Sequence, residues 1–411
     1  MISLREAQSE VLAGVKPLGT EALTLAEAAS RRLAAMVSAP HPVPPFANSA
    51  MDGYALRAQD VAAVPVTLPV VGEIAAGQAP HRQLEPGTTM RIMTGAPMPP
   101  GADAVVRVED ATLTADGVVI SAAVPPGHDV RPVGGDLTAG TTVGEPGDEL
   151  HPARLGLLAS VGAAAVPVYR RPRVAVLSTG DELREPAEPD LPFGAIRDAN
   201  RATLKALCAE AGAAVDDLGI VGDDPASLRA VLAGAGAAAD VVVSSGGVSM
   251  GVYDPVKRAY EDSGDVQFRQ VAMQPGKPFA HGSIGKARFF GLPGNPVSVL
   301  VSFEQFVRPV LLALAGSPVL FRPRIPVCLG ETVATNPDKV VFVRVEVEQA
   351  GDGWTARRSG GQASNVLSAL AAANGLAVVP VGVGTVQQGG SVQCEMLRWP
   401  PNRTSEEALG E

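Results

Sequence analysis

The segment 243–251, VSSGGVSMG, carries the residue types best suited to holding an anion. An apolar strand is predicted to run here into glycines, whose backbone N–H groups approach an anion closely, just ahead of a helix N-terminus. Serine hydroxyls add further donors, and the candidate ligand-binding residues are Ser245, Gly246, Gly247, Ser249 and Gly251. The alternative is a tight strand-to-helix turn that needs glycine for backbone reasons alone.

Two proline-containing loops offer similar chemistry. The segment 292–298, LPGNPVS, predicts a rigid turn that delivers a helix N-terminus, and its candidates are Pro293, Gly294, Asn295, Pro296 and Ser298. The segment 274–279, QPGKPF, presents Lys277 on a stiffened loop, where an ammonium group can pair with phosphate as a point charge. A simple turn and a surface lysine are the competing interpretations.

Carboxylates follow other predicted strands and loops. The segment 177–183, LSTGDEL, places Asp181 and Glu182 at a strand end, although adjacent loop carboxylates are often merely solvated. Asp52 in 48–54, NSAMDGY, precedes a glycine and is also compatible with simple turn chemistry. Thr94 lies in the Gly/Pro-rich loop 91–101, whose Met and Thr are not needed for folding.

Anion-binding loops collected with carboxylates predict a bound cation. The carboxylates in question are Asp52, Asp136, Glu182 and Asp254. They would repel an anionic ligand unless a divalent ion lay between them, and this combination is typical of Mg²⁺-assisted chemistry on phosphate esters or anhydrides. The residues alone therefore predict a Mg²⁺-dependent enzyme that acts on a phosphorylated or nucleotide-like ligand.

An α/β domain is expected to position most of these loops. Between 172 and 316, predicted strands at 174–178, 214–220, 240–244 and 266–273 alternate with predicted helices at 201–211, 225–235 and 255–262. This order favours a mostly parallel sheet with helices on both faces. In such sheets the ligand lies at the carboxyl ends of the strands.

The remaining chain predicts three other parts. Residues 1–40 read as helices, with a capping-box pattern at Ser3–Glu6 and helical spacing over 21–35. Short apolar runs at 64–74, 88–93, 104–108 and 117–121 predict a small β domain inserted before a helix at 151–161. Val341, Val343, Val345 and Val347 alternate with Phe342, Arg344, Glu346 and Glu348, which predicts a C-terminal β domain.

We therefore expect a multidomain protein of α/β plus β class. The expected parts are a discontinuous helical linking domain (1–45 and 146–171), an inserted β domain (46–145), a central α/β domain (172–320) and a C-terminal β-barrel-like domain (321–411).

Composition excludes several classes of protein. The net charge of −10, without a basic run, and 4% aromatic residues argue against nucleic-acid binding. Three widely spaced cysteines give no disulfide framework, and the five histidines show no zinc-type spacing. The apolar window 296–315 contains Glu304, Arg308 and Pro309, which predicts a buried helix rather than a membrane span. Because segment 1–15 is charged and amphipathic rather than a secretory signal, we expect a cytoplasmic protein.

Taken together, the motifs resemble one family. Six of them occur in order along about 250 residues, namely 49–55 (SAMDGYA), 94–96 (TGA), 178–183 (STGDEL), 245–251 (SGGVSMG) with Asp254, 275–278 (PGKP) and 293–298 (PGNPVS). The set is similar to the molybdopterin molybdenumtransferase family, MoeA and the gephyrin E domain, and the resemblance covers nearly the whole chain.

The resemblance implies a molybdopterin-binding α/β fold and the last step of molybdenum cofactor synthesis. Such proteins insert molybdate into adenylylated molybdopterin and release AMP with Mg²⁺. They are homodimers whose cleft lies between the α/β domain of one subunit and the β domain of the other. A molybdopterin adenylyltransferase upstream and molybdoenzyme chaperones downstream are the implied partners.

Site roles follow from the resemblance position by position. Asp52, Thr94 and Asp136 correspond to residues of the β domain, whereas Glu182 and Asp254 correspond to carboxylates suited to Mg²⁺. The two glycine-containing loops correspond to the binding site of the pterin and its phosphate. The remaining candidates match by charge or by rougher alignment, and they are Lys257, Lys277, Arg344 and Ser364.

One departure and two rival functions stand beside this hypothesis. Where many relatives carry lysine before Pro-Gly-Lys, this chain has Gln274, which removes one cation. Molybdopterin adenylyltransferase is the nearest rival, but such enzymes resemble the α/β domain alone. A non-catalytic scaffold of the same fold is the other rival, and the retained carboxylates, Asp52 among them, favour an enzyme.

Overall fold

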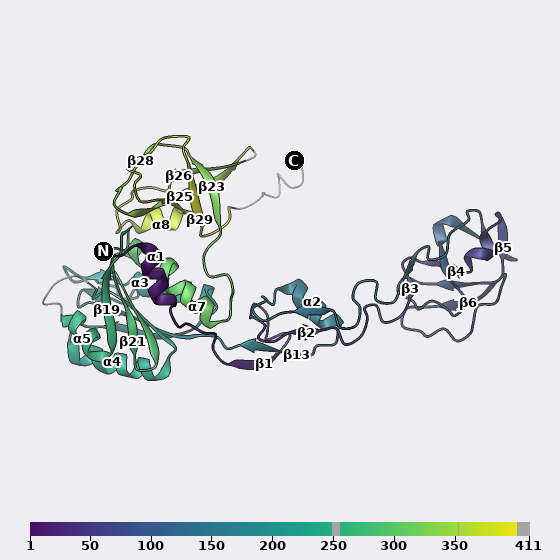
Figure 1. Cartoon of the computed structure of the whole chain (residues 1–411), viewed down its shortest axis with the longest axis horizontal. Coiled ribbons are helices and arrows are strands. Elements are labelled where there is room, and N and C mark those ends of the chain that lie inside the picture. Colours follow the sequence, from purple (N-terminus) through teal and green to yellow (C-terminus); the bar gives the residue numbers. More distant parts are fainter. Residues whose placement is uncertain (249–254, 352, 401–411) are drawn as a thin grey trace. The chain divides into compact units, whose positions relative to one another are not determined.

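The computed structural model describes residues 1–248, 255–351 and 353–400 (Figure 1). The chain divides into two compact units. The first comprises Met1–Glu21, Ser30–Arg32 and Val168–Glu411, and the second comprises Ala22–Ala29 and Leu33–Pro167. The sequence predicts four domains with boundaries at 45/46, 145/146, 171/172 and 320/321, and this finer division stays a prediction.

A six-stranded sheet forms the centre of the first unit. Its order is β17 (Ala214–Val221), β14 (Arg173–Thr179), β18 (Val241–Ser245), β22 (Ala287–Leu292), β21 (Pro278–Ile284) and β19 (Asp265–Gln270). The first four strands run parallel, β21 is antiparallel to β22 beside them, and the edge strand β19 is antiparallel to β21 and so runs in the same direction as the first four. The mostly parallel sheet is therefore confirmed, although the strand expected over 266–273 ends at Gln270.

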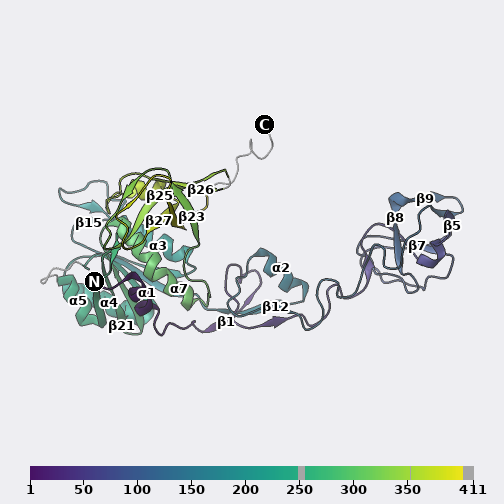
Figure 2. The same ribbon diagram turned by 45° about the horizontal axis from the view of Figure 1, so that its top comes forward.

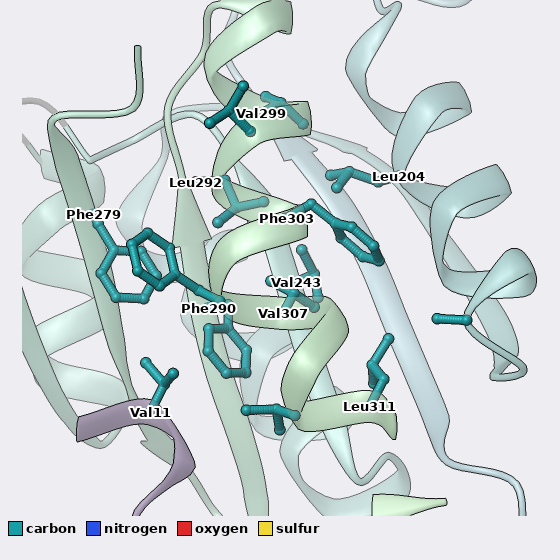
Figure 3. Packing of buried hydrophobic residues seen from close by; sticks show 14 of the residues in the cluster. Val11, Leu204, Val243, Phe279, Phe290, Leu292, Val299, Phe303, Val307 and Leu311 are labelled. Atoms are coloured by element: carbon teal, nitrogen blue, oxygen red, sulfur yellow. The ribbon is translucent and has the colours of Figure 1, made fainter. Parts of the chain in front are cut away.

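Helices cover both faces of this sheet, because its strands are apolar on both sides. Along β14, Val174 and Val176 join one core while Ala175 and Leu177 join the other. The first core packs against α1 (Leu4–Leu12), α3 (Asn200–Glu210), α6 (Pro296–Ser302) and α7 (Arg308–Leu314), as Figure 3 shows in part. The second core packs against α4 (Pro225–Ala238) and α5 (Pro255–Ser263), which lie side by side in Figures 1 and 2.

The continuous helix predicted over 296–315 is confirmed as a core helix. A π-helical turn, Phe303–Val307, joins α6 to α7. Glu304 Oε2 in this turn lies 3.7 Å from Nε of Arg308, the first residue of α7. By length and composition, Pro296–Leu314 would be long and apolar enough to cross a membrane. However, 78% of its most apolar window is buried inside the protein, as expected for a core element.

The C-terminal part of the first unit is a closed, barrel-like sheet. Its order is β20 (Met273–Gln274), β25 (Val340–Ala350), β26 (Gly353–Arg358), β23 (Arg324–Leu329), β29 (Ser391–Met396) and β27 (Gly375–Val379), and an additional β25–β27 pairing closes it. This part also contains the antiparallel pair of β24 (Val333–Ala334) with β28 (Thr385–Val386) and the helix α8 (Leu367–Ala372). The sequence missed α8.

The predicted alternation in β25 is real but hides a second buried face. The four alternating valines from Val341 to Val347 belong to the core of the barrel-like sheet. On the opposite face Phe342 joins the core of the α/β sheet, and Arg344 is also buried. Only the distal Glu346 and Glu348 of that face are exposed, so the strand is amphipathic over its second half alone.

The second unit is built mainly from short strands. One sheet has the order β6 (Val70–Ile74), β7 (Thr89–Ile92), β4 (Gly53–Leu56) and β8 (Ala104–Arg107), and another has β5 (Val66–Leu68), β10 (Gly117–Ile120) and β9 (Ala111–Thr114). The apolar run 64–74 thus becomes two strands in different sheets, separated by Pro69. Proline lacks the N–H that a continuous ladder would need.

The described residues also form smaller strand pairs, a further α-helix, and two 3-10 turns at Ala58–Val61 and Val108–Asp110. The pairs are β1 (Thr20–Thr24) with β13 (Ala165–Tyr169), β2 (Val37–Ser38) with β12 (Thr142–Gly144), β3 (Asn48–Ser49) with β11 (Val130–Arg131), and β15 (Leu183–Arg184) with β16 (Ile196–Arg197). The helix α2 (Pro152–Ser160) confirms the prediction for 151–161, and the capping box of Ser3 and Glu6 begins α1 as expected.

The helix predicted over 21–35 is wrong. This segment begins as strand β1 and continues into turns. Thr24 and Glu27 exchange side-chain and backbone hydrogen bonds as in a helix cap, and the Ala28 N–H bonds to the Thr24 carbonyl. The turn stops at Ser30, whose φ of 60° is left-handed. A local capping pattern therefore gives one turn and no helix, because nothing extends it.

Candidate active site

A cavity of about 680 Å³ lies in the first unit, beyond the carboxyl ends of β14, β18 and β22. Parallel strands end at one edge of the sheet, so the loops that follow them meet there. From these loops the cavity wall includes Thr179, Gly180, Glu182, Ser245, Gly246, Gly247, Pro293, Gly294, Asn295 and Pro296. Seven of the sequence-derived candidates of the two glycine-containing loops are thereby brought together, namely Ser245, Gly246, Gly247, Pro293, Gly294, Asn295 and Pro296.

The loop after β18 needs its glycines for backbone reasons as well. Gly246 and Gly247 have φ values of 97° and 69°, in the left-handed region. A Cβ on Gly247 would lie 2.0 Å from Cγ1 of Val256, and one on Gly246 would lie 2.6 Å from the Thr179 carbonyl oxygen. The same two glycines therefore form both the tight turn and part of the cavity wall. Three predicted residues, Ser249, Gly251 and Asp254, lie outside the described residues.

The loop after β22 leads into α6. The sequence predicted a helix N-terminus at this loop, and the structure confirms it: Asn295 is the N-cap residue and Pro296 the first residue of α6. The Asn295 side chain makes no capping hydrogen bond. Ser298 is buried inside the first turn and does not line the cavity, so its place in the site stays a prediction.

Asn200 joins the two loops, and sequence reasoning missed it. Its Nδ2 lies 2.8 Å from Ser245 Oγ and 2.6 Å from the Gly294 carbonyl oxygen. Asn200 is the first residue of α3 and lines the cavity itself. A single asparagine just ahead of a predicted helix gave a weak signal, because capping alone explains that residue type there.

Among the described residues, three carboxylates line the cavity, and they differ in environment. Asp198 is 3% exposed and accepts hydrogen bonds from Ser178 Oγ and from the Arg201 backbone and guanidinium, so it is structurally engaged. Burial opposes the charge of Arg201, but hydrogen bonds to its carboxylate partners outweigh this and raise the pKa of the guanidinium. Glu182 is exposed, and Asp223 is the third member.

The exposed Glu182 carboxylate lies against Gly180, in space that a side chain at this position would fill. A Cβ at Gly180, where φ is 148°, would lie 2.6 Å from both carboxylate oxygens. No ion pair of Glu182 is recorded within 1–248, 255–351 and 353–400. Over the same residues no group of three or more His, Cys, Asp or Glu side chains is arranged to hold a metal ion.

The two predicted lysines lie outside the cavity wall. Lys277 is exposed, and its carbonyl accepts a hydrogen bond from the Val271 N–H, while the next residue, Pro278, lines the cavity. Lys257 lies on α5, and its ammonium nitrogen is 5.0 Å from the centre of the Phe268 ring on β19. Gln274 lines a different cavity of about 300 Å³, formed with residues of the barrel-like sheet.

Arg344 and Ser364 support one wall of the larger cavity rather than lining it. Arg344 is 1% exposed, and its Nη2 donates to the carbonyls of Gly361 and Ala363 at 2.7 and 3.1 Å. Burial lowers the pKa of this guanidinium. The Ser364 carbonyl accepts from the Val297 N–H of α6 at 3.1 Å. These contacts hold the segment whose next residues, Asn365 and Leu367, line the cavity.

The second unit contains its own polar cluster around Asp52. The Thr94 N–H and hydroxyl both donate to Asp52 Oδ1, at 2.6 and 2.7 Å. These two bonds, the backbone bond first, lower the pKa of the Asp52 carboxyl. Two predicted residues 42 positions apart therefore meet. Asp136 is exposed in the same unit, and its N–H bonds to the Val43 carbonyl.

An ion pair between Arg107 and Asp129 supports the Asp52 loop. Asp129 has a φ of 48°, which is unusual for a residue other than glycine, and its carbonyl accepts from the Ala50 N–H at 2.8 Å. Its carboxylate accepts from Arg107 Nε at 2.8 Å, and this bond lowers the pKa of the Asp129 carboxyl. Arg107 pairs with Gly53 across strands β8 and β4, so both sides of the loop are held.

Three family models match successive parts of the chain. The MoeA N-terminal region (domain I and II) matches residues 2–162, a probable molybdopterin binding domain matches 175–313, and the MoeA C-terminal region (domain IV) matches 326–397.

Known proteins agree with these matches over most of the chain. Molybdopterin molybdenumtransferase 2 of Mycobacterium tuberculosis is 42% identical over 404 residues, covering 96% of this chain and 99% of the relative. The molybdopterin molybdenumtransferase of Haemophilus influenzae is 43% identical over 325 residues, covering 79% and 80%. A crystal structure of a molybdopterin biosynthesis MoeA protein from Pyrococcus horikoshii matches with a TM-score of 0.82 at 31% identity, covering 97% of this chain and all of that one.

The parallel sheet with its glycine-lined edge and the closed C-terminal sheet define a molybdopterin-binding protein class of mixed α/β and β architecture. Within that class, the chain belongs to the MoeA family of molybdopterin molybdenumtransferases, an enzyme family.

Proposed function

We propose that this protein inserts molybdenum into adenylylated molybdopterin and releases AMP, the last step of molybdenum cofactor biosynthesis. The cavity at the carboxyl ends of β14, β18 and β22 carries this proposal, since it unites both glycine-containing loops with the exposed Glu182. Its volume of about 680 Å³ suits a ligand of cofactor size. The loops supply backbone and hydroxyl donors for a pterin and its phosphate.

Magnesium fits the donors on this wall. Mg²⁺ is commonly held by one or two carboxylates together with phosphate oxygens and water. Glu182 is an accessible carboxylate, and Asp254 is the second ligand in our proposal. When bound, the ion would neutralise charge on the phosphoanhydride. The carboxylates would then no longer repel the ligand.

The other predicted residues receive roles in the same proposal. Lys277 supplies positive charge near the cavity, because its neighbour Pro278 lies on the wall. Arg344 and Ser364 keep the wall segment that contains Asn365 in place. The β domain contributes two catalytic residues, Asp136 and Asp52, and the hydrogen bonds from Thr94 favour the ionised form of Asp52.

The cellular setting is also part of the proposal. We infer a cytoplasmic homodimer, divided into the four domains expected from the sequence. Its substrates are molybdate and the product of a molybdopterin adenylyltransferase, and molybdoenzyme chaperones receive its product. Neither nucleic acid nor a membrane is involved.

Release of AMP from adenylylated molybdopterin tests the function directly. Purified protein is assayed with and without molybdate and Mg²⁺. AMP release that requires both supports the proposal. A folded protein that binds the ligand but releases no AMP under any condition would instead be a scaffold.

A further inference from the structure

The amide of Asn200 has a fixed orientation. The Gly294 carbonyl oxygen is an acceptor only, so the Asn200 atom 2.6 Å from it must be the nitrogen. The same nitrogen lies 2.8 Å from Ser245 Oγ. Its two hydrogens therefore serve one acceptor on each glycine-containing loop, which removes the usual ambiguity between amide nitrogen and oxygen.

This orientation determines the hydrogen-bonding role of the Ser245 hydroxyl, whose oxygen accepts from Asn200. Because Oγ accepts from Asn200, its own hydrogen must be donated elsewhere. Ser245 is 2% exposed, ends strand β18 and lines the cavity. Within residues 1–248, 255–351 and 353–400, no group accepts a hydrogen bond from the Ser245 hydroxyl. A buried hydroxyl donor is thus available at the cavity wall.

Asn200 itself stands on a rigid support. It begins α3, two residues after the buried Asp198, which Ser178 and Arg201 hold by hydrogen bonds. Helix α3 packs through Leu204 and Cys208 into the core of the first unit. The amide is therefore placed by the fold before any ligand arrives, which is the condition for a preorganised donor.

We propose that Asn200 is a positioning residue that orients the Ser245 hydroxyl as a donor to a phosphate oxygen of the ligand. The inference rests on the proposed function and adds the residue that sets the polarity of its phosphate site. Hydrogen bonds to charged oxygens are stronger than those between neutral groups. A free rotor, by contrast, must lose its rotational freedom when the ligand binds.

The proposal is tested by a double-mutant cycle of Asn200→Ala and Ser245→Ala. The readouts are AMP affinity by titration calorimetry, adenosine affinity as the phosphate-free probe, and KM and kcat for AMP release. Each single variant is expected to weaken AMP binding roughly tenfold and to raise KM more than it lowers kcat. Because Asn200 acts through Ser245, the double variant should bind AMP within about twofold of Ser245→Ala.

Asn200→Asp separates polarity from loss of contact. A carboxylate there is an acceptor only, so it opposes the Gly294 carbonyl and draws the Ser245 hydrogen toward itself. It should weaken AMP binding more than Asn200→Ala does. Asn365→Asp adds the same charge to the same cavity wall without a bond to Ser245, and it therefore measures the effect of charge alone.

The outcomes separate this inference from the proposed function. Non-additive losses of AMP affinity, with adenosine affinity unchanged, support it even if wild-type protein releases no AMP, in which case the function alone fails. Additive losses, or equal losses for AMP and adenosine, overturn it even if wild-type turnover is normal. Asn200 would then only hold the loops together. Thermal melting of every variant checks that the fold is retained.

Discussion

Glu182 and Asp52 are both exposed loop carboxylates, yet their surroundings are opposite. Asp52, in the second unit, accepts two hydrogen bonds from Thr94, and the ion pair of Arg107 with Asp129 supports its loop. Glu182, in the first unit, lies on the cavity wall, where Gly180 leaves space around it. A carboxylate that accepts two hydrogen bonds is restrained in position and favoured in its charged form. One with space around it can bind a cation.

The largest expected effect comes from removing the open carboxylate. Glu182→Gln should lower kcat for AMP release roughly 10²–10³-fold, because the proposed Mg²⁺ ligand loses its charge. The melting temperature should stay the same, since the side chain is exposed. Asp190→Asn, an exposed carboxylate in the same loop region but off the cavity wall, is the matched control. Equal kcat in the two variants would refute the role of Glu182.

The fixed carboxylate is expected to respond through its pKa. Thr94→Val removes the hydroxyl donor to Asp52 and leaves the backbone donor, so the pKa of the carboxyl should rise toward its ordinary value. We expect about a tenfold lower kcat. A carboxylate with a raised pKa is protonated sooner on acidification, so the acid limb of the kcat/KM profile should move to higher pH.

Thr88→Val is the control for that profile, because the Thr88 hydroxyl donates to the Glu85 carbonyl in the same unit and not to a carboxylate. An acid limb that stays in place in Thr94→Val would mean that Asp52 is not the titrating group.

Filling the space beside Glu182 should have a smaller effect. In Gly180→Ala the new methyl group meets a flexible side chain, which can move away, and the φ of 148° adds some strain. We expect a fewfold rise in the Mg²⁺ concentration needed for half-maximal AMP release. Gly294→Ala is a useful comparison, since a Cβ there meets no atom within 4 Å. A larger effect at Gly294 would contradict the steric argument.

The smallest effect is expected from the support of the Asp52 loop. Arg107 is 45% exposed, so Arg107→Gln should lower the unfolding free energy only slightly, because water screens an exposed ion pair. Chemical denaturation measures this change, and kcat should fall by no more than a fewfold. A change in unfolding free energy of several kcal/mol would show that the pair with Asp129 carries much of the stability of this unit.

Sequence reasoning found residues whose local context is distinctive. A strand that runs into glycines, or a proline turn that begins a helix, has the same meaning wherever it occurs, and so the loops at 245–247 and 293–296 were predicted and meet at one cavity. Asp52 and Thr94 are in contact as well, although only the family resemblance grouped them before the structure did.

It failed where long-range contacts decide. Asn200 matters because of partners 45 and 94 positions away, and nothing in its immediate sequence shows them. The apparent helix over 21–35 reduces to one capped turn, since local propensity alone does not sustain a helix without packing. A rougher alignment with the family predicted Arg344 in the cleft, but Arg344 is buried behind the segment that lines the cavity.

The bond from the Val297 N–H to the Ser364 carbonyl has a consequence for protein engineering. It connects the start of α6 to the segment of the C-terminal part that supplies Asn365 and Leu367 to the cavity. Phe342 of that part also packs in the core of the α/β sheet. A transplanted α/β domain alone would therefore lack one wall of its pocket and expose an apolar surface. The C-terminal part is therefore not an independent module, and an engineered transfer of the pocket should include both the α/β domain and the C-terminal part.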